Sequence, residues 1–232
     1  MCIKAIPGNP FIKRSKGFNT ASKPHDLRHT PLYCLWPHPK NGGASPMRMC
    51  IFGKNQIENT QIMIPRIRLV LTDIDGVWTD GGLYYIQDVQ PAKKFHTYDS
   101  FGVLALQMNG IEVGLLSGDD NPVMLSRAER LKIGLIRTGV RNKLAIADEL
   151  RLERGLMWSE IAYIGDDVMD LNLLKAVGWS GTVPNAPQYV QEEVGFVTPV
   201  RGGEGAFRSF AEYLLDAFDL LDDTIAQIRK NS

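Results

Sequence analysis

The sequence has little cysteine, and none of it lies beyond residue 62. Cys2, Cys34 and Cys50 are the only three in 232 residues, so disulfide bonds cannot stabilise the larger part of the chain. This pattern favours a reducing compartment, the cytoplasm. No apolar run approaches the roughly 20 residues that span a membrane. The N-terminus also lacks the continuous apolar core of a secretory signal. These absences predict a cytoplasmic protein without a membrane partner.

An excess of one charge is absent as well, because 26 Lys and Arg balance 26 Asp and Glu. A net charge of zero argues against a nucleic-acid-binding protein. The charges are nevertheless unevenly distributed. Residues 1–62 hold nine basic and two acidic side chains, whereas residues 63–232 carry a net charge of −7. We therefore expect an N-terminal extension at 1–62 and a separate domain at 63–232.

The first 62 residues lack any persistent helical or strand period, because Pro, Gly, Asn and Lys interrupt every apolar run. We interpret them as a disordered extension or as sequence outside the natural catalytic unit, with Met63 as a possible internal start. Two alternatives remain open. One is a basic arm for an acidic partner. The other is a metal site, which lacks any Cys-x-x-Cys spacing and would use His25, His29, His38, Cys34 and Cys50.

From residue 67 onward, apolar runs alternate with amphipathic segments. The runs at 67–72, 111–116, 135–136, 161–164, 179–183 and 196–198 predict strands. The segments 99–110, 121–132, 142–154, 168–177, 187–194 and 205–221 predict helices, the first of them capped by Asp99 or Ser100. Two β-prone runs, 82–86 and 92–96, predict a projecting hairpin that Asp80 caps. This alternation predicts an α/β fold, a Rossmann-like three-layer α/β/α sandwich with a mainly parallel central sheet.

Polar side chains follow three of the predicted strands. Asp73 and Asp75 come after the first strand, Ser117 after the second, and Asp166 with Asp167 after a later one. The carboxyl ends of parallel strands meet at one edge of the sheet, where such folds bind ligands. Buried carboxylates are costly unless a cation or donors compensate them. Asp73 and Asp166 are therefore expected to share one Mg²⁺, which prefers hard oxygen ligands.

These residues can carry out phosphoryl transfer. A carboxylate such as Asp73 can attack phosphorus and form an aspartyl-phosphate. Asp75, two residues further on, can give a proton to the leaving oxygen and later activate water. Ser117 can donate a hydrogen bond to a phosphoryl oxygen, and Lys143 can offset the negative charge. Asp170 stands four residues after Asp166, so it can either support the metal or stabilise the first helical turn.

The segments 73–81 (DIDGVWTDG) and 165–170 (GDDVMD), with Ser117 and Lys143 between them, resemble the four motifs of haloacid dehalogenase-type phosphatases in order and spacing. Within that superfamily, the chain resembles the capless group that hydrolyses phosphorylated 2-keto-3-deoxy sugar acids. The resemblance runs from about residue 67 to about residue 221. It implies a phosphomonoester hydrolase without a large cap domain.

The resemblance also implies roles for individual residues. Asp73 would be the nucleophile and a metal ligand, and Asp75 the general acid/base, with its backbone carbonyl on Mg²⁺. Asp166 would be a further ligand, supported by Asp167 and Asp170. Ser117 and Lys143 would bind the phosphoryl group. The family forms homotetramers in which a hairpin and a neighbour's C-terminal region close each site. The glycine-rich segment 201–208 matches that C-terminal region.

The residue after Ser117-Gly118 departs from the eight-carbon branch of the family. Octulosonate 8-phosphate phosphatases usually have Arg there, whereas this chain has Asp119, which is closer to the Glu of the nine-carbon branch. Asp119 and Arg130 are expected to form an acid–base couple that reads the sugar. The candidate substrate-binding residues are Gly118, Asp119, Arg127, Arg130, Arg201 and Arg208.

The first hypothesis is therefore a Mg²⁺-dependent phosphatase for a nonulosonate 9-phosphate. The alternatives are an octulosonate 8-phosphate phosphatase and a non-catalytic oligomerisation domain, related to those fused to acylneuraminate cytidylyltransferases. The intact set of Asp73, Asp75, Lys143 and Asp166 argues against the non-catalytic alternative.

Overall fold

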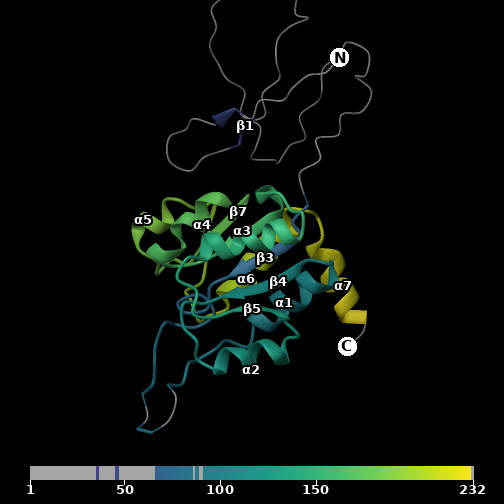
Figure 1. The fold of residues 1–232 in the computed structure, drawn as a ribbon. Coiled ribbons are helices and arrows are strands. Elements are labelled where there is room, and N and C mark those ends of the chain that lie inside the picture. The colour runs from purple at the N-terminus through teal and green to yellow at the C-terminus, as the bar shows by residue number, and fades with distance from the viewer. Residues whose placement is uncertain (1–34, 37–44, 47–65, 86, 89–90, 231–232) are drawn as a thin grey trace, which may run out of the picture.

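A computed structural model describes residues 35–36, 45–46, 66–85, 87–88 and 91–230 (Figure 1). In the N-terminal part, β1 (Leu35–Trp36) pairs antiparallel with β2 (Ser45–Pro46). The rest of the predicted extension lies outside the described residues, as do the five residues of the alternative metal site and the start at Met63.

The centre of the protein is a six-stranded sheet in which every pairing is parallel. Its strands lie in the order β5-β4-β3-β6-β7-β8. The bounds are β3 (Leu69–Thr72), β4 (Glu112–Leu116), β5 (Leu135–Arg137), β6 (Ile161–Ile164), β7 (Trp179–Thr182) and β8 (Phe196–Val197). The chain adds strands on one side of β3 and then returns to its other side. The point where the order reverses therefore lies beside β3.

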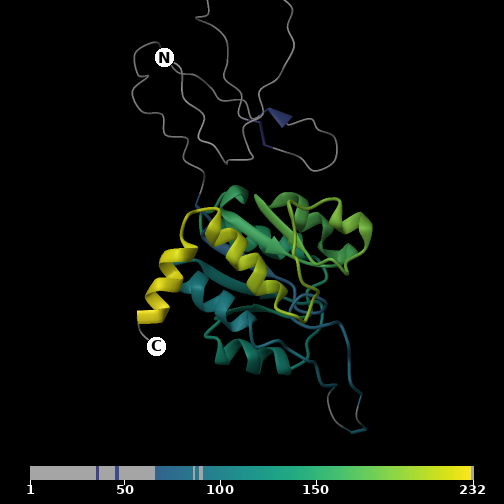
Figure 2. The same cartoon turned by 180° about the vertical axis from the view of Figure 1, so that it is seen from behind.

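Helices cover both faces of this sheet (Figures 1 and 2). One face packs against α1 (Asp99–Met108), α2 (Val123–Arg130) and α6 (Ala206–Asp216). The other face packs against α3 (Lys143–Glu153), α4 (Leu171–Ala176) and α5 (Gln188–Gln191). The predicted α/β/α sandwich is confirmed.

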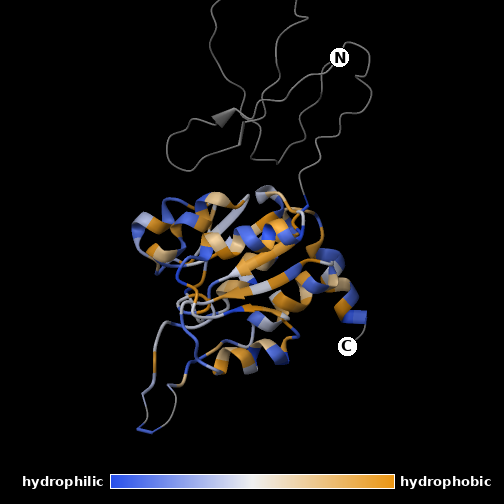
Figure 3. Cartoon of the chain, viewed as in Figure 1, coloured by the Kyte–Doolittle hydropathy of each residue, from blue (hydrophilic) through white to orange (hydrophobic). Residues whose placement is uncertain are grey.

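The central strand β3 is apolar on both faces because each face is covered by helices. Val70 belongs to the core beneath α1 and α6, whereas Leu69 and Leu71 belong to the core beneath α3 and α4. Each of these side chains is fully buried and contributes about 1.5–3 kcal/mol. Figure 3 shows the sheet as a band of hydrophobic residues between more hydrophilic outer surfaces.

The C-terminal helix differs from the prediction. The expected helix at 205–221 is wrong as a single element, because α6 ends at Asp216 and α7 (Leu221–Lys230) follows after a turn. Asp219 has a φ of 56°, in the left-handed region, and the Leu220 N–H donates to the Leu215 carbonyl at 2.9 Å. This reversal closes the end of α6. The predicted helix at 168–177 likewise begins as a 3-10 turn (Val168–Asp170) before α4.

The segment between β3 and α1 is a hairpin-like excursion that projects from the body of the domain (Figure 1). It contains two isolated antiparallel bridges, Thr79 with Phe95 and Tyr84 with Ala92, instead of the two continuous strands expected. Residues 86, 89 and 90 lie outside the described part. Asp80 accepts the Gly82 N–H at 3.0 Å, in agreement with the predicted cap.

The predicted caps of α1 are both wrong. The N-cap is Tyr98, and it makes no side-chain cap bond. Asp99 instead accepts the backbone N–H of Arg208 in α6 at 3.0 Å, and the Ser100 hydroxyl accepts a bond from Arg127 in α2 at 3.0 Å. Burial raises the pKa of Asp99 to about 6, although the Arg208 N–H and the Arg127 charge oppose the shift. Both side chains therefore join helices together.

Among the helices of the described residues, none is both long and apolar enough to cross a membrane.

Candidate active site

The register of the sheet gathers the predicted site residues at one edge. Thr72, the last residue of β3, pairs with Leu115 in β4 and with Ile164 in β6. The Asp73 N–H then donates to the Ile164 carbonyl at 2.9 Å. Asp73 therefore follows β3 at the level where β4 leads to Ser117 and β6 leads to Asp166. The convergence expected from the sequence is confirmed.

Three carboxylates form a compact cluster at this edge. Asp73, Asp166 and Asp170 each offer an oxygen, and these oxygens lie within 4.8 Å of one another. Gly76 has a φ of 83°, and a Cβ there would stand 1.9 Å from the Asp166 carboxylate, so this glycine lets the two loops approach. Among the described residues, this cluster has the geometry to hold a cation.

The three carboxylates of the cluster carry more negative charge than the single ammonium of Lys143 can balance. Burial raises the pKa of Asp166 to about 8, and the charges of Asp73 and Asp170 add to the shift. Burial also raises the pKa of Asp73 to about 6, although the ammonium of Lys143 opposes this. Both shifts mean that the ionised carboxylates are unfavourable without further positive charge. A divalent cation between them would supply that charge.

Lys143 provides the one positive charge that contacts the cluster in the described structure. Its ammonium lies 2.9 Å from Asp73 Oδ1 and 2.6 Å from Asp170 Oδ1. It is the first residue of α3, whose N-cap Asn142 accepts the Ala145 N–H at 3.1 Å. Burial opposes the charge, but the two carboxylates outweigh it and raise the pKa of Lys143.

Asp170 organises the loop after β6. Its Oδ1 accepts from Lys143 and from the buried Tyr163 hydroxyl at 2.5 Å. Its Oδ2 accepts the backbone N–H groups of Asp166 and Asp167, at 3.0 and 3.1 Å. The Asp167 carboxylate in turn accepts the Val168 N–H at 2.7 Å. Asp170 thus stabilises the first turn and also fixes the position of Asp166.

Asp75 is held by a residue that the sequence analysis missed. Lys93, from the second arm of the hairpin, places its ammonium 2.8 Å from Asp75 Oδ2 and 2.5 Å from Asp119 Oδ2. Burial opposes its charge, but hydrogen bonds to the two carboxylates raise the pKa of Lys93. The bond from Lys93 lowers the pKa of Asp119. The one sequence signal was its place in a short β-prone run, where alternate side chains face inward.

Ser117 and Gly118 form the turn after β4. The Ser117 hydroxyl oxygen accepts the Asp119 N–H at 3.1 Å, and the Ser117 carbonyl accepts the Val140 N–H at 2.9 Å. A hydroxyl that accepts one bond keeps its own hydrogen for donation. Ser117 is 1% exposed, so it can donate to a ligand at the sheet edge without competition from bulk water.

The predicted couple of Asp119 and Arg130 is wrong. No ion pair joins them in the described part of the chain; Asp119 pairs with Lys93, and Arg130 is exposed. Arg127 donates to the His96 carbonyl at 3.1 Å and to Ser100. Arg208 pairs with Glu212 at 2.8 Å and lies over the Phe101 ring, whereas Arg201 is exposed. In the described structure, none of the four arginines forms an ion pair with the acidic cluster.

The glycine-rich segment packs directly on the loop after β3. The Gly203 N–H donates to the Val77 carbonyl at 3.0 Å, and the Gly202 N–H donates to Asn185 at 3.0 Å. A Cβ at Gly202 would lie 1.7 Å from the Gly76 carbonyl oxygen. Trp78, from the same loop, stacks on Phe207 with ring centroids 4.6 Å apart. The C-terminal segment therefore supports the loop that carries Asp73 and Asp75.

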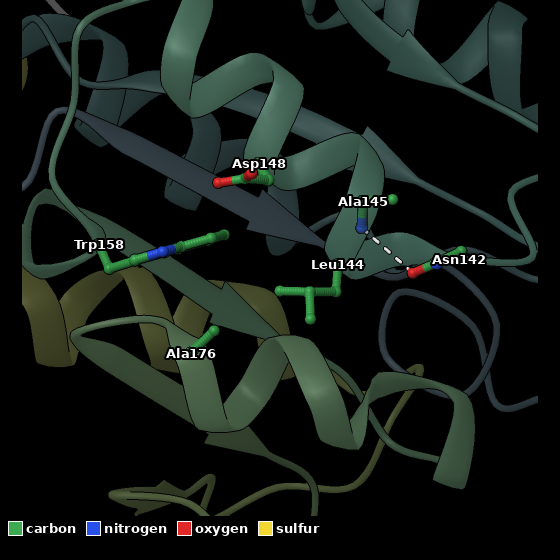
Figure 4. A pocket seen from close by; sticks show the side chains of 6 residues that line it. All are labelled: Asn142, Leu144, Ala145, Asp148, Trp158 and Ala176. Carbon is green, nitrogen blue, oxygen red and sulfur yellow. Dashed lines mark hydrogen bonds between the residues drawn. The ribbon is translucent and has the colours of Figure 1, made fainter.

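A separate hollow of about 400 Å³ lies between α3 and α4 (Figure 4). It is lined by Asn142, Leu144, Ala145, Asp148, Trp158 and Ala176. None of the predicted site residues lines it, so the candidate site is the acidic sheet edge and not this hollow.

Comparisons with known proteins show which proteins this chain resembles. The 3-deoxy-D-manno-octulosonate 8-phosphate phosphatase KdsC of Haemophilus influenzae is 38% identical over 157 residues, which are 68% of this chain and 87% of that protein. The enzyme of the same name from Escherichia coli K12 is 31% identical over 161 residues, 69% of this chain and 86% of that protein. No protein-family model matches the chain.

Solved structures give the same result. The 3-deoxy-D-manno-octulosonate 8-phosphate phosphatase of Moraxella catarrhalis, in complex with magnesium, phosphate and KDO, superposes with a TM-score of 0.69 at 32% identity. The alignment covers 71% of this chain and 95% of that structure. A probable YrbI family phosphatase from Pseudomonas syringae pv. phaseolica also has a TM-score of 0.69, at 35% identity over 71% of this chain and 93% of that one.

We predict that Gly202→Ala destabilises the domain by about 1–3 kcal/mol, because the new methyl group would meet the Gly76 carbonyl. Denaturant unfolding measures the effect. Gly134→Ala is the control, since a Cβ there meets nothing within 4 Å, and its change should stay within about 0.5 kcal/mol. Equal effects of the two substitutions would contradict the close packing.

Proposed function

Because the chain belongs to the haloacid dehalogenase superfamily, in the family of the 3-deoxy-D-manno-octulosonate 8-phosphate phosphatases, we propose that it hydrolyses the phosphate ester of a 2-keto-3-deoxy sugar acid with Mg²⁺. The observation that carries this proposal is the cluster of the buried Asp73 and Asp170 with the half-buried Asp166, beside Lys143. Three carboxylates and one ammonium would repel an anionic phosphate ester unless a cation joined them.

The residues fit a magnesium ion. Asp73 and Asp166 supply carboxylate oxygens, and the Asp166 side chain accepts no hydrogen bond among the described residues. The backbone carbonyl of Asp75 completes the protein ligands that the family resemblance implies, while Asp167 and Asp170 shape the loop that carries Asp166. When bound, the ion would neutralise charge on the phosphoryl group and on the carboxylates around it.

The first step transfers the phosphoryl group to the protein. An oxygen of the Asp73 carboxylate attacks phosphorus, and the bond between phosphorus and the sugar oxygen breaks. Asp75, in its protonated form, gives its proton to that oxygen, so the sugar leaves as a neutral alcohol. The Ser117 hydroxyl and the Lys143 ammonium bind phosphoryl oxygens and stabilise their charge.

The second step releases phosphate. Asp75, now ionised, takes a proton from a water molecule whose oxygen attacks phosphorus. The bond from phosphorus to the Asp73 oxygen breaks, and inorganic phosphate leaves. Both carboxyl groups then return to their starting protonation states, and the net reaction consumes one water molecule.

The substrate we propose first is an octulosonate 8-phosphate, because the curated relatives reported above carry that activity in their names. A nonulosonate 9-phosphate, which the sequence alone favoured, is the second candidate. It is supported by Asp119, an acidic residue placed beside Lys93 and Asp75 where a sugar hydroxyl could be bound. The exposed Arg130 and Arg201 are candidate partners for the substrate carboxylate. The side chains of Arg127 and Arg208 are already bound, to His96 and Ser100 and to Glu212 respectively, so they are weaker candidates.

A comparison of the two sugar phosphates tests the proposal. We expect Mg²⁺-dependent phosphate release, abolished by a chelator, with kcat/KM at least about tenfold higher for the octulosonate ester, since one extra group in a pocket changes binding by that order. A tenfold preference for the nonulosonate ester would instead establish the second candidate. Release from neither ester would contradict the proposed function.

Replacing the nucleophile tests the mechanism. Asp73→Asn should lower kcat to below about 10⁻³ of the wild-type value. The protein should stay folded, because the amide oxygen can still accept from Lys143 and one charge leaves an overcrowded cluster. Asp80→Asn, an exposed residue paired with Lys94, is the control and should keep full activity. Wild-type rates for Asp73→Asn would refute the role of Asp73.

We also propose the homotetramer that the family resemblance implies, with the hairpin at its interface. Leu83, Tyr84 and Tyr85 of the hairpin are 44%, 56% and 79% exposed, on an arm that leaves the domain. Light scattering should give four times the chain mass of 25.9 kDa. Replacing all three residues with Ser should lower this mass, whereas Leu152→Ser, an exposed leucine on α3, should not. A monomeric wild type would contradict the proposal.

A further inference from the structure

Lys93 is a buried lysine to which the proposed mechanism gives no task. Its side chain is 1% exposed, and its ammonium lies between Asp75 and Asp119. Lysine is almost never fully buried unless it is paired. Its three donors can serve two carboxylates at once. A lysine in such a place links the two acids that flank it.

The backbone around Lys93 is fixed on both sides. Ala92 bridges Tyr84, and Phe95 bridges Thr79, which belongs to the loop after β3. Side chains alternate along such an extended segment. Lys94 accordingly turns outward, is 53% exposed and pairs with Asp80 at 3.2 Å, whereas Lys93 turns inward. The position of the Lys93 ammonium is therefore set by the same loop that carries Asp75.

Among the described residues, the Asp75 carboxylate has two hydrogen-bond contacts. Lys93 binds Oδ2 at 2.8 Å, and the Thr79 hydroxyl lies 3.5 Å from Oδ1, at the limit of a hydrogen bond. Lys93 is thus the stronger constraint on the direction of this carboxylate. A carboxyl group transfers a proton efficiently only when it is held toward the reacting oxygen.

Asp119 depends on the same ammonium. It follows Ser117 and Gly118, and its backbone N–H donates to the Ser117 hydroxyl, which places it in the turn that we assign to phosphate binding. Its carboxylate is 39% exposed and so remains open to a ligand on one side. Asp75 follows β3 and Asp119 follows β4. Lys93 connects the two through its ion pairs with both carboxylates.

We propose that Lys93 is a positioning residue that binds Asp75 and Asp119 into one ionic cluster, so that the proton-transferring carboxylate and the sugar-facing carboxylate keep a fixed relation. This inference rests on the proposed phosphatase function and deepens it. Lys93 acts through Asp75, so its loss should matter most for substrates whose leaving oxygen needs a proton.

The test is the leaving-group dependence of Lys93→Met, which keeps the length of the side chain and removes its charge. We expect kcat/KM for the sugar acid phosphate to fall by about 100-fold or more. For 4-nitrophenyl phosphate, whose phenolate leaves without a proton, the loss should stay below about tenfold. Because kcat/KM reports only the steps up to departure of the alcohol, the later activation of water does not contribute. Equal losses with both substrates would overturn the proposal.

Lys94→Met is the matched control, since it removes the neighbouring, exposed lysine. It should leave kcat/KM for both substrates and the unfolding temperature at their wild-type values.

A thermal unfolding cycle tests the ionic cluster without any reference to activity. Lys93→Met leaves two carboxylates without their cation, so the unfolding temperature should fall by at least about 3 °C. Adding Asp119→Asn to Lys93→Met should recover part of that loss. If the shift of the double variant equals the sum of the shifts of Lys93→Met and Asp119→Asn alone, the proposed ionic cluster is contradicted.

The failures can be told apart. A wild type that releases phosphate from neither sugar ester contradicts the proposed function, while the unfolding cycle still decides whether Lys93 links the two acids. An active wild type with uniform losses in Lys93→Met removes only the positioning role.

Discussion

The site depends on the contacts of one buried carboxylate, Asp170. It accepts from Lys143, from Tyr163 and from the two backbone N–H groups of the loop after β6. A buried charge is tolerated only when its hydrogen bonds are complete, and here they are. Through Lys143 the same group fixes Asp73, and through the loop it fixes Asp166. The two proposed metal ligands on neighbouring strands thus share one support.

Much of this arrangement follows from local sequence. Residues 69–72 and 161–164 are short apolar runs followed closely by acids, a pattern that favours strands covered on both faces. Parallel strands then bring their carboxyl ends together whatever the details of packing. For this reason the fold class, and the meeting of Asp73, Ser117 and Asp166, could be predicted without coordinates.

The rest depends on contacts between residues far apart in the chain. Asp99 and Ser100 are good capping residues, but α6 and α2 bind their side chains instead. Asp119 has a basic neighbour on the next helix, yet it pairs with Lys93 from the hairpin. The break before α7 needs a left-handed Asp219, for which the sequence offers no glycine. For Asp99, Ser100 and Asp119, a tertiary partner replaces the local one, and no periodicity reveals it.

The packing of the glycine-rich segment on the loop after β3 has a consequence for biosynthesis. The loop is translated early, but Gly202, Gly203 and Phe207, against which it rests, are among the last parts of the domain to be made. Such contacts close late because they join distant parts of the chain. A nascent chain that already contains every acid of the candidate site would therefore hold Asp73, the proposed nucleophile, on an unsupported loop. On the proposed mechanism, we therefore expect an incomplete translation product to be a poor hydrolase even when all its proposed reacting groups are present.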